Sequence, residues 1–421
     1  MKNKNVKSFS KNVLTLFTGS FLAQIISVGA LVILQRYFYT PEDYAPFRLF
    51  FEFVAVFSSI SALRLESGIV LEREDSKALS LLRVCLKYTV VIALLGGVLF
   101  SIYFFNEKIT FQEEWILLIL MPIAIFANGI IQISQSFFTR SKQFIAISSS
   151  KILHSFSGSI SQVLGGLNGL SFIGLIIGRI VGLLTADLNY VYSFFKKFNW
   201  SKKNKPVEKE LIQKHKHFIW FTTPGIFLGN SINLVILMLF THFYDDKFTG
   251  LTAAAIQYMG LAIMLFTSSF AQVYYHEIAK IDDPTKLRNS YTYWLKRLFL
   301  VTLLGWLTLI MIPNQWITYI LGEKWEELMP VIKLISPWMA IMFLASSLSY
   351  IFIRLGKQKQ IFFFDLFHLL LIIGTIFTAH YLNNKPLDTL CFVTVSQSIF
   401  YILALALAYY FMNKAVKQNK I

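Results

Sequence analysis

The segment WILLILMPIAIFANGIIQISQSFF, residues 115–138, contains no charged side chain. As a helix it is long enough to cross a hydrocarbon core about 30 Å thick. The rest of the chain has the same character, because 55% of its 421 residues are apolar and only 15% are charged. Soluble proteins carry roughly a quarter charged residues. We therefore predict an all-α integral membrane protein.

Apolar runs of similar length recur along the chain and predict about twelve transmembrane helices. The predicted spans are residues 12–35, 46–71, 84–105, 115–138, 147–167, 170–193, 218–241, 250–275, 298–320, 328–353, 360–381 and 389–412. The first is interpreted as a retained span, because it is too long for a signal-peptide core and lacks a small-residue cleavage site. The segment 276–297 is predicted to be an amphipathic helix in the membrane interface.

The distribution of basic residues predicts the orientation of these spans. In this layout, 30 of the 39 Lys and Arg residues lie in alternate segments that share one side of the membrane. Basic residues are retained in the cytoplasm during insertion, so this side is cytoplasmic and both termini lie there. The net charge of +16 therefore reflects topology. It does not indicate nucleic acid, because no soluble domain with basic and aromatic residues interleaved is expected.

The longest cytoplasmic segment, residues 195–217, carries eight lysines and is predicted to link two halves. We expect an N-terminal six-helix bundle in residues 1–194 and a C-terminal six-helix bundle with a basic tail in residues 218–421. Short similarities support a repeat, since FYTPED at 38–43 ends the first span and FYDD at 243–246 ends the seventh. Six spans is an even number, so the bundles would be related by a pseudo-twofold axis along the membrane normal.

Arg179 is the most costly residue in the predicted spans, about nine residues into the sixth. An arginine near the bilayer centre costs roughly 2.5–3.5 kcal/mol on insertion scales, and such residues usually face a bundle interior or a wet cavity. Gly174, Gly178 and Gly182 form a stripe that allows another helix to approach closely. Arg179 lies beside this stripe and is expected to point inward. There it would either line a cavity or pair with a carboxylate such as Asp187.

Other polar residues in the spans have two interpretations each. Arg64 and Glu66 are too close in sequence to share one helix face, so each needs a partner elsewhere or reaches the cytoplasmic interface. Lys151 and His154 continue a serine-rich face of the fifth span, which predicts a cavity wall or hydrogen bonds between helices. A set of inward-facing cations suits an anionic substrate, particularly a diphosphate, because arginine presents planar donors that match phosphate oxygens.

Four stretches carry a resemblance to one family. They are RYFYTPEDY at 36–44, LRLESGIVL at 63–71, residues 132–178 from Gln132 to the glycines of GLIIG, and residues 321–358 from LGEKW to LGKQ. This pattern resembles the Wzx-like polysaccharide, or lipid-linked oligosaccharide, flippases of the multidrug/oligosaccharidyl-lipid/polysaccharide exporter superfamily. The chain departs from the family at Ala45, where relatives often have glycine, and in the eighth span, which lacks a proline often found there.

The resemblance implies two bundles that alternate between inward-open and outward-open states in the bacterial cytoplasmic membrane. It implies a substrate of undecaprenyl-diphosphate-linked oligosaccharide, flipped from the cytoplasmic to the outer leaflet. Candidate contacts for the diphosphate and the sugars are Arg36, Arg64, Arg140, Lys151, His154 and Arg179. Candidates for coupling to protons or sodium are Glu66 and Asp187. Membrane lipid and a glycan polymerase or other assembly protein are expected partners; no nucleic acid, cofactor or metal is expected.

Three other functions stay open. A drug/cation antiporter of the same superfamily should present carboxylates in its cavity, whereas this chain offers mainly Arg and Lys. A membrane glycan polymerase or ligase is less favoured, because the outer loops are short and no nucleophile–base pair or metal-ligand spacing is present. A scaffold or sensor is disfavoured because charge within the bilayer is costly to retain without use.

Overall fold

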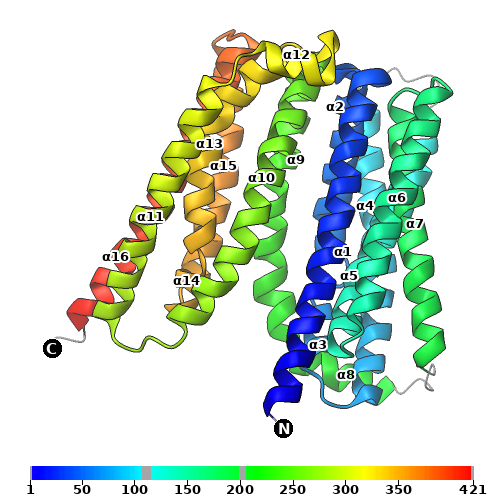
Figure 1. The fold of residues 1–421 in the computed structure, drawn as a ribbon, viewed down its shortest axis with the longest axis vertical. Helices are drawn as coiled ribbons and strands as arrows, with labels where there is room; N and C mark the ends of the chain where they lie inside the picture. The colour runs from blue at the N-terminus through cyan, green and yellow to red at the C-terminus, as the bar shows by residue number, and fades with distance from the viewer. Residues whose placement is uncertain (1, 107–114, 199–204, 419–421) are drawn as a thin grey trace. The chain divides into compact units, whose positions relative to one another are not determined.

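The fold is helical throughout the residues that the computed structural model describes, 2–106, 115–198 and 205–418 (Figure 1). Contacts between Cα atoms divide the chain into two compact units. Unit 1 is Met1–Leu234 and unit 2 is Val235–Ile421. The boundary falls within one helix, α9 (Thr223–Phe243).

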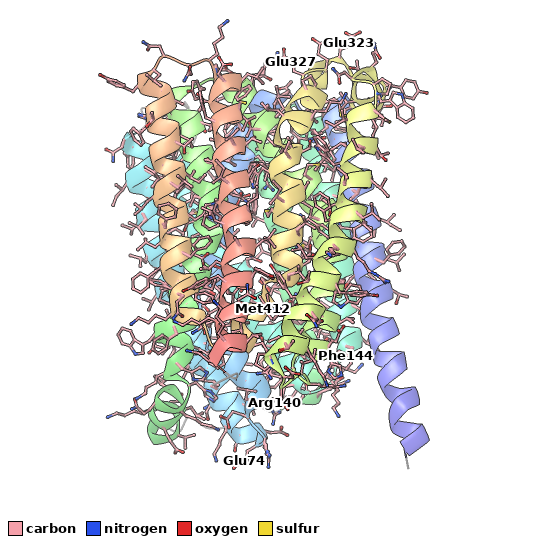
Figure 2. All side chains as sticks on the ribbon, turned by 90° about the vertical axis from the view of Figure 1, so that its left-hand side faces the viewer. Glu74, Arg140, Phe144, Glu323, Glu327 and Met412 are labelled. Atoms are coloured by element: carbon pink, nitrogen blue, oxygen red, sulfur yellow. The ribbon has the colours of Figure 1, made fainter. Side chains whose placement is uncertain are left out.

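Unit 1 is a bundle of long helices with two short ones, α3 and α8, at the end where Arg140 and Glu74 lie (Figures 1 and 2). Its elements before α9 are α1 (Lys2–Tyr37), α2 (Pro41–Ser59), α3 (Glu66–Leu71), α4 (Asp75–Asn106), α5 (Trp115–Arg140), α6 (Phe144–Leu167), α7 (Phe172–Lys197), α8 (Lys205–Lys214) and a π-helical turn (Phe218–Thr222).

Unit 2 contains the second part of α9 and five further long helices. Its elements after α9 are α10 (Asp246–Ile278), α11 (Pro284–Met311), α12 (Gln315–Leu321), a 3₁₀ turn (Glu323–Trp325), α13 (Leu328–Leu348), α14 (Tyr350–Arg354), α15 (Gln358–Tyr381) and α16 (Pro386–Gln418). Glu323 and Glu327 lie at the opposite end of this unit from Met412 (Figure 2).

Nine helical segments in the described residues are long and apolar enough to cross a membrane. The predicted count of twelve is larger because α2, α6 and α10 are not among the nine. α2 carries four charged residues, and α6 is rich in serine. Around them, the outer faces are apolar: Val91, Leu94 and Val98 of α4 are each more than half exposed. Such surfaces suit hydrocarbon, and the chain is a multi-pass integral membrane protein.

The second predicted span, residues 46–71, is wrong as one continuous helix. α2 ends at Ser59, and the chain then turns before α3 begins at Glu66. Leu63 and Arg64 have φ angles of 51° and 59°, in the left-handed region that a continuous helix of L-residues excludes. The break brings the side chains of Arg64 and Glu66 together, which a regular helix would separate.

The amphipathic interfacial helix predicted at residues 276–297 is also wrong. α10 ends at Ile278, and α11 continues without interruption from Pro284 to Met311. Asp283 caps α11, because its side chain accepts a hydrogen bond from the backbone N–H of Thr285, and Pro284 occupies the first turn. The charged segment is therefore the first part of a long membrane helix.

The glycine stripe of α7 is packed directly on α6, as the sequence predicts. A Cβ atom at Gly178 would lie 2.5 Å from the backbone nitrogen of Gln162, and one at Gly182 would lie 3.1 Å from Cα of Gly158. The two backbones therefore touch along this seam, which only glycine permits. The Gln162 side chain continues the seam by donating from Nε2 to the carbonyl of Leu175 at 3.0 Å.

Unit 2 has its own apolar core near the end where Met412 lies. Tyr274, Tyr291 and Met412 are each at most 1% exposed within it. At the same end Arg354, the last residue of α14, donates from Nε and Nη2 to the carbonyls of Ile278 and Ile281 at 3.1 and 2.6 Å. These bonds tie the loop between α10 and α11 to the end of α14.

Candidate functional site

Arg179 lies on the inward face of α7 and is nevertheless accessible. The side chain is exposed, although its neighbours Gly178 and Ile180 are buried. The exposed apolar residues Leu184 and Leu188 lie on the opposite face, about 140–180° away at roughly 100° per residue. Arg179 is therefore accessible on the side of α7 that is turned away from these lipid-suited residues.

Two other basic residues lie within electrostatic range of Arg179. Arg48 of α2 and His154 of α6 both interact with the guanidinium, and Tyr44 of α2 also contributes. We call Arg48, His154 and Arg179 the cationic cluster. Three different helices supply one residue each, so the cluster exists only in the folded unit.

Arg48 is held in place by a neighbouring carboxylate. Its Nη2 donates to Oε1 of Glu52 at 2.5 Å, one helical turn further along α2. The pair is largely buried, with the two side chains 19% and 13% exposed. Because Glu52 offsets the charge of Arg48, the remaining positive charge of the cluster belongs mainly to Arg179. This arrangement can accept an anionic group beside a fixed guanidinium.

The serine-rich face of α6 is used largely for contacts with α1. Lys151 donates from Nζ to the Ser20 hydroxyl at 2.9 Å, and the Ser27 hydroxyl donates to that of Ser155 at 3.0 Å. This face was predicted to form either a cavity wall or hydrogen bonds between helices. For Lys151, the structure shows the second. His154, three residues further along, belongs to the cationic cluster instead.

Arg64 and Glu66 contact each other, contrary to the prediction that each needs a partner elsewhere. Nη1 of Arg64 lies 3.1 Å from Oε1 of Glu66. The left-handed backbone at Arg64 makes this possible, because it turns the guanidinium toward a residue only two positions away. Glu66 is buried, with 4% of its surface exposed, whereas the Arg64 side chain is 26% exposed, so the carboxylate is shielded from water and the guanidinium only partly.

Asp187 is a buried carboxylate in α7 without a hydrogen-bond donor among the described residues. The residue is 7% exposed, and neither carboxylate oxygen accepts a hydrogen bond there. The alternative in which Arg179 pairs with Asp187 is wrong, because no such ion pair forms and the two are eight residues apart on one helix. A buried carboxylate without partners is costly when ionised, so it has a strong tendency to bind a proton or cation.

Comparisons with known proteins agree with this architecture. Residues 33–330 match a family described as "Polysaccharide biosynthesis protein". The chain belongs to the polysaccharide biosynthesis protein family. A search of curated proteins found no match.

Solved structures similar to this family member are transporters of the MOP superfamily. An inward-facing multidrug resistance MATE family transporter matches with a TM-score of 0.68 at 14% identity, covering 96% of both chains. The lipid II flippase MurJ in an inward closed conformation matches with a TM-score of 0.70 at 17% identity, covering 93% of this chain and 86% of the other. A transporter from Pyrococcus furiosus, described as having a binding pocket of reverse polarity, matches with a TM-score of 0.64 at 12% identity and 97% and 96% coverage. At these identities the likeness shows the fold.

Two of the predicted site residues of this family member lie away from the cationic cluster. Arg36 is exposed in the last turn of α1, with its guanidinium 5.7 Å from the ring centroid of Tyr37. Arg140 ends α5 and donates to the carbonyls of Glu72 and Arg73 at 2.7 and 2.9 Å. A third bond joins its Nη1 to Asp75 at 2.6 Å, so its donors are used in holding the α3–α4 loop.

The sequence interpretation missed Arg48 and Glu52. Their spacing of four residues on an apolar span was the available signal, because it predicts an ion pair on one helix face. It also missed the contact of Glu72 with Lys214 and His215, which joins residues more than 140 positions apart. No local pattern marks these three, because Lys214 and His215 resemble the rest of a basic linker.

Proposed function

We propose that this protein is a transporter that moves an undecaprenyl-diphosphate-linked oligosaccharide from the cytoplasmic to the outer leaflet of a bacterial cytoplasmic membrane. The observation that carries this proposal is the accessible Arg179, placed beside Arg48 and His154 inside a bundle whose outer face is apolar. A guanidinium inside a bundle binds phosphate oxygens more strongly than one in bulk water, because the local dielectric constant is lower.

The comparisons support the class of substrate. Membership of the polysaccharide biosynthesis protein family connects the chain to glycan assembly. One similar structure is named a lipid II flippase, so a protein of this fold moves a lipid substrate across a membrane. A lipid-linked oligosaccharide fits both the family and the similar flippase, since it is both a glycan precursor and a lipid.

Twelve spans in two six-helix halves, with both termini in the cytoplasm, form part of the proposal. The halves are residues 1–194 and 218–421, joined by 195–217 and related by the pseudo-twofold axis. Equivalent packing within each unit supports the repeat: α5 packs on α2, α4 and α7, and α13 packs on α10, α11 and α16. These are the second, third, fourth and sixth long helices of each half, and similar halves suit alternating access.

Asp187 is the candidate for energy coupling within this proposal. It is buried beside the α6–α7 seam and lacks hydrogen-bond donors among the described residues. A carboxylate in this state can take up a proton or sodium ion in one conformation and release it in another that admits water. Glu66 is the weaker candidate, because Arg64 already lies 3.1 Å from it.

A drug/cation antiporter is the alternative that the comparisons keep open, because the similar structures include multidrug transporters. The cationic cluster argues against it, since an organic cation would be repelled by the accessible Arg179. The two functions give different phenotypes. Deletion of a flippase gene should remove the surface glycan. Deletion of a drug exporter gene should leave the glycan intact and increase the sensitivity of the cells to cationic drugs.

The decisive experiment is deletion of the gene followed by analysis of lipid-linked glycan in membrane vesicles of known orientation. We expect the glycan to accumulate on the cytoplasmic leaflet and to return to the surface on complementation with the wild-type gene. A deletion strain that exports surface glycan normally and traps no lipid-linked precursor would contradict the proposal.

A further inference from the structure

α8 is a fixed part of unit 1, although it belongs to the segment predicted to link the two halves. It packs against α4. Leu211 is 1% exposed and belongs to an apolar core with Leu65, Ile69 and Leu81. Lys209, on the same helix, is exposed. α8 is therefore amphipathic and buries its apolar face in the bundle.

The end of α8 is fastened by a buried carboxylate. Glu72, in the loop between α3 and α4, is 4% exposed. Its Oε1 accepts a hydrogen bond from Nζ of Lys214 at 2.6 Å and lies 2.7 Å from Nε2 of His215. The backbone carbonyl of Glu72 also accepts the bond from Arg140. We call Glu72, Lys214 and His215 the clamp cluster, because it joins α8 and the α3–α4 loop.

His215 also packs directly on α3. It is 3% exposed, and a Cβ atom at Gly68 would lie 3.0 Å from its Cγ. α3 has only six residues and follows the left-handed turn that carries Arg64. A helix this short is not stable by itself, so its position depends on the groups that pack on it. Glu66, the first residue of α3, is thereby placed by His215 and the core beneath it.

We propose that the clamp cluster positions the Arg64–Glu66 ion pair by fastening α8 onto α3, so that the segment between the halves controls a polar pair inside unit 1. Glu72 and His215 are positioning residues, because they act on the pair through α3. The fastening stands on the contacts alone. The consequence for transport rests on the proposed function.

Cysteine labelling tests the fastening without a transport assay. Leu211 and Lys209 are each replaced by cysteine in full-length protein whose native Cys85 and Cys391 are changed to alanine and serine. A membrane-impermeant maleimide, applied to inverted vesicles, should label K209C rapidly and L211C slowly. Glu72→Gln and His215→Phe should raise the labelling rate of L211C about tenfold or more, because the first removes the charge that Lys214 binds and the second takes one donor away from the buried Glu72 carboxylate. K209C should be unaffected by either change.

His215→Gln is the matched conservative variant, since its side-chain amide can still donate to Glu72. It should keep L211C protected and keep transport active. If Glu72→Gln and His215→Phe both leave L211C as protected as before, the clamp is overturned, whatever transport does. If they release α8 while glycan export continues at the original rate, the positioning role is overturned. Failure of the proposed function is a separate result, because deletion would then trap no glycan although labelling still reports the clamp.

Discussion

Arg140 and Arg354 make the same kinds of hydrogen bond, one in each unit. Each stands at the end of a helix and donates from Nε and Nη2 to two backbone carbonyls of a loop that precedes it by about 70 residues. Each also reaches a carboxylate, Asp75 at the start of α4 or Asp282 in the α10–α11 loop, at 2.6 and 3.2 Å. The two loops join the second to the third long helix of each half, so the pair supports the proposed repeat in chemical detail.

We expect Arg140→Gln to destabilise the protein more than Arg354→Gln does. The Arg140 side chain is 10% exposed and that of Arg354 is 29% exposed, so Arg140 loses better shielded bonds. Loss of hydrogen bonds to a charged group costs about 1.5–3 kcal/mol each before partial replacement by water. Thermal unfolding in detergent, followed by Trp fluorescence, measures both. Lysine should not restore stability at either position, because one ammonium group cannot reach all the acceptors. Equal stability of both glutamine variants and the wild type would show that these bonds contribute nothing.

Arg179→Ala should abolish glycan export while leaving membrane insertion and thermal stability nearly unchanged. The guanidinium is accessible and forms no salt bridge among the described residues, so folding does not depend on it. Arg36→Ala is the matched control, since Arg36 lies in the last turn of α1 and is not among the groups that act electrostatically on Arg179. Surface glycan staining in the deletion strain compares the two. Full export by the Arg179→Ala protein would remove the cationic cluster from the proposed site.

Gly178→Ala should destabilise unit 1 by about 1–3 kcal/mol, because the added methyl group overpacks a closed interface. Its Cβ would lie 2.5 Å from backbone and side-chain atoms of Gln162 in α6. Gly374→Ala in α15 is the control, because nothing lies within 4 Å of its Cβ position. That change should be neutral or stabilising, since alanine favours helix over glycine. Unfolding temperatures in detergent decide the matter, and a harmless Gly178→Ala would mean that the two helices can separate.

Asp187→Asn should fold at least as stably as the wild type and should fail to transport. The amide has the same shape, and removing a carboxylate that lacks donors among the described residues removes a desolvation cost. On the proposed coupling role, uptake or release of a proton or cation then stops. Export measured with and without an imposed ion gradient separates coupling from folding. A large loss of stability in the asparagine variant would show that the carboxylate makes a bond that folding needs.

The clamp cluster should lose its contribution to stability in acid. Burial raises the pKa of Glu72, but the bonds from Lys214 and His215 outweigh burial and hold this pKa below its ordinary value of 4.5. Its stabilisation is therefore complete above about pH 4.5 and is lost as the pH falls through the lowered value. Lys77 also lies within electrostatic range of Glu72, and its raised pKa keeps it charged over this range. The difference in unfolding temperature between wild type and Glu72→Gln should shrink below pH 4.5; a constant difference would contradict the role of this charge.

The sequence predicted the membrane class, the family and the close approach at the glycine seam, because each depends on local pattern. Apolar length identifies a span, and glycines four residues apart leave one helix face without side chains. The same reasoning failed at Arg64, because a left-handed turn inside an apolar segment leaves no compositional sign. It also predicted a separate interfacial helix at residues 276–297, where the charged residues in fact continue into the long helix that begins at Pro284.

The structure places the predicted site residues in different parts of unit 1, and the reason is physical. Charge near a span indicates that a residue needs a partner, but it does not say which partner. Arg140 donates to backbone carbonyls, and Lys151 donates to a serine hydroxyl. Arg179 stays accessible on the inward face of its helix. Arg48 lies within electrostatic range of Arg179 because α2 packs beside α7, and this packing cannot be read from the local sequence.

The seam between α6 and α7 has a consequence for any transport cycle. Where two backbones touch at glycines, few side chains lie between them to rearrange, so we expect the two helices to move together as one rigid pair. His154 lies on one helix of this pair and Arg179 on the other, so the distance between them would stay constant through the transport cycle. On the proposed function, release of a bound phosphate would then depend on a change outside this pair, and Arg48 of α2 is the neighbouring group that could supply it.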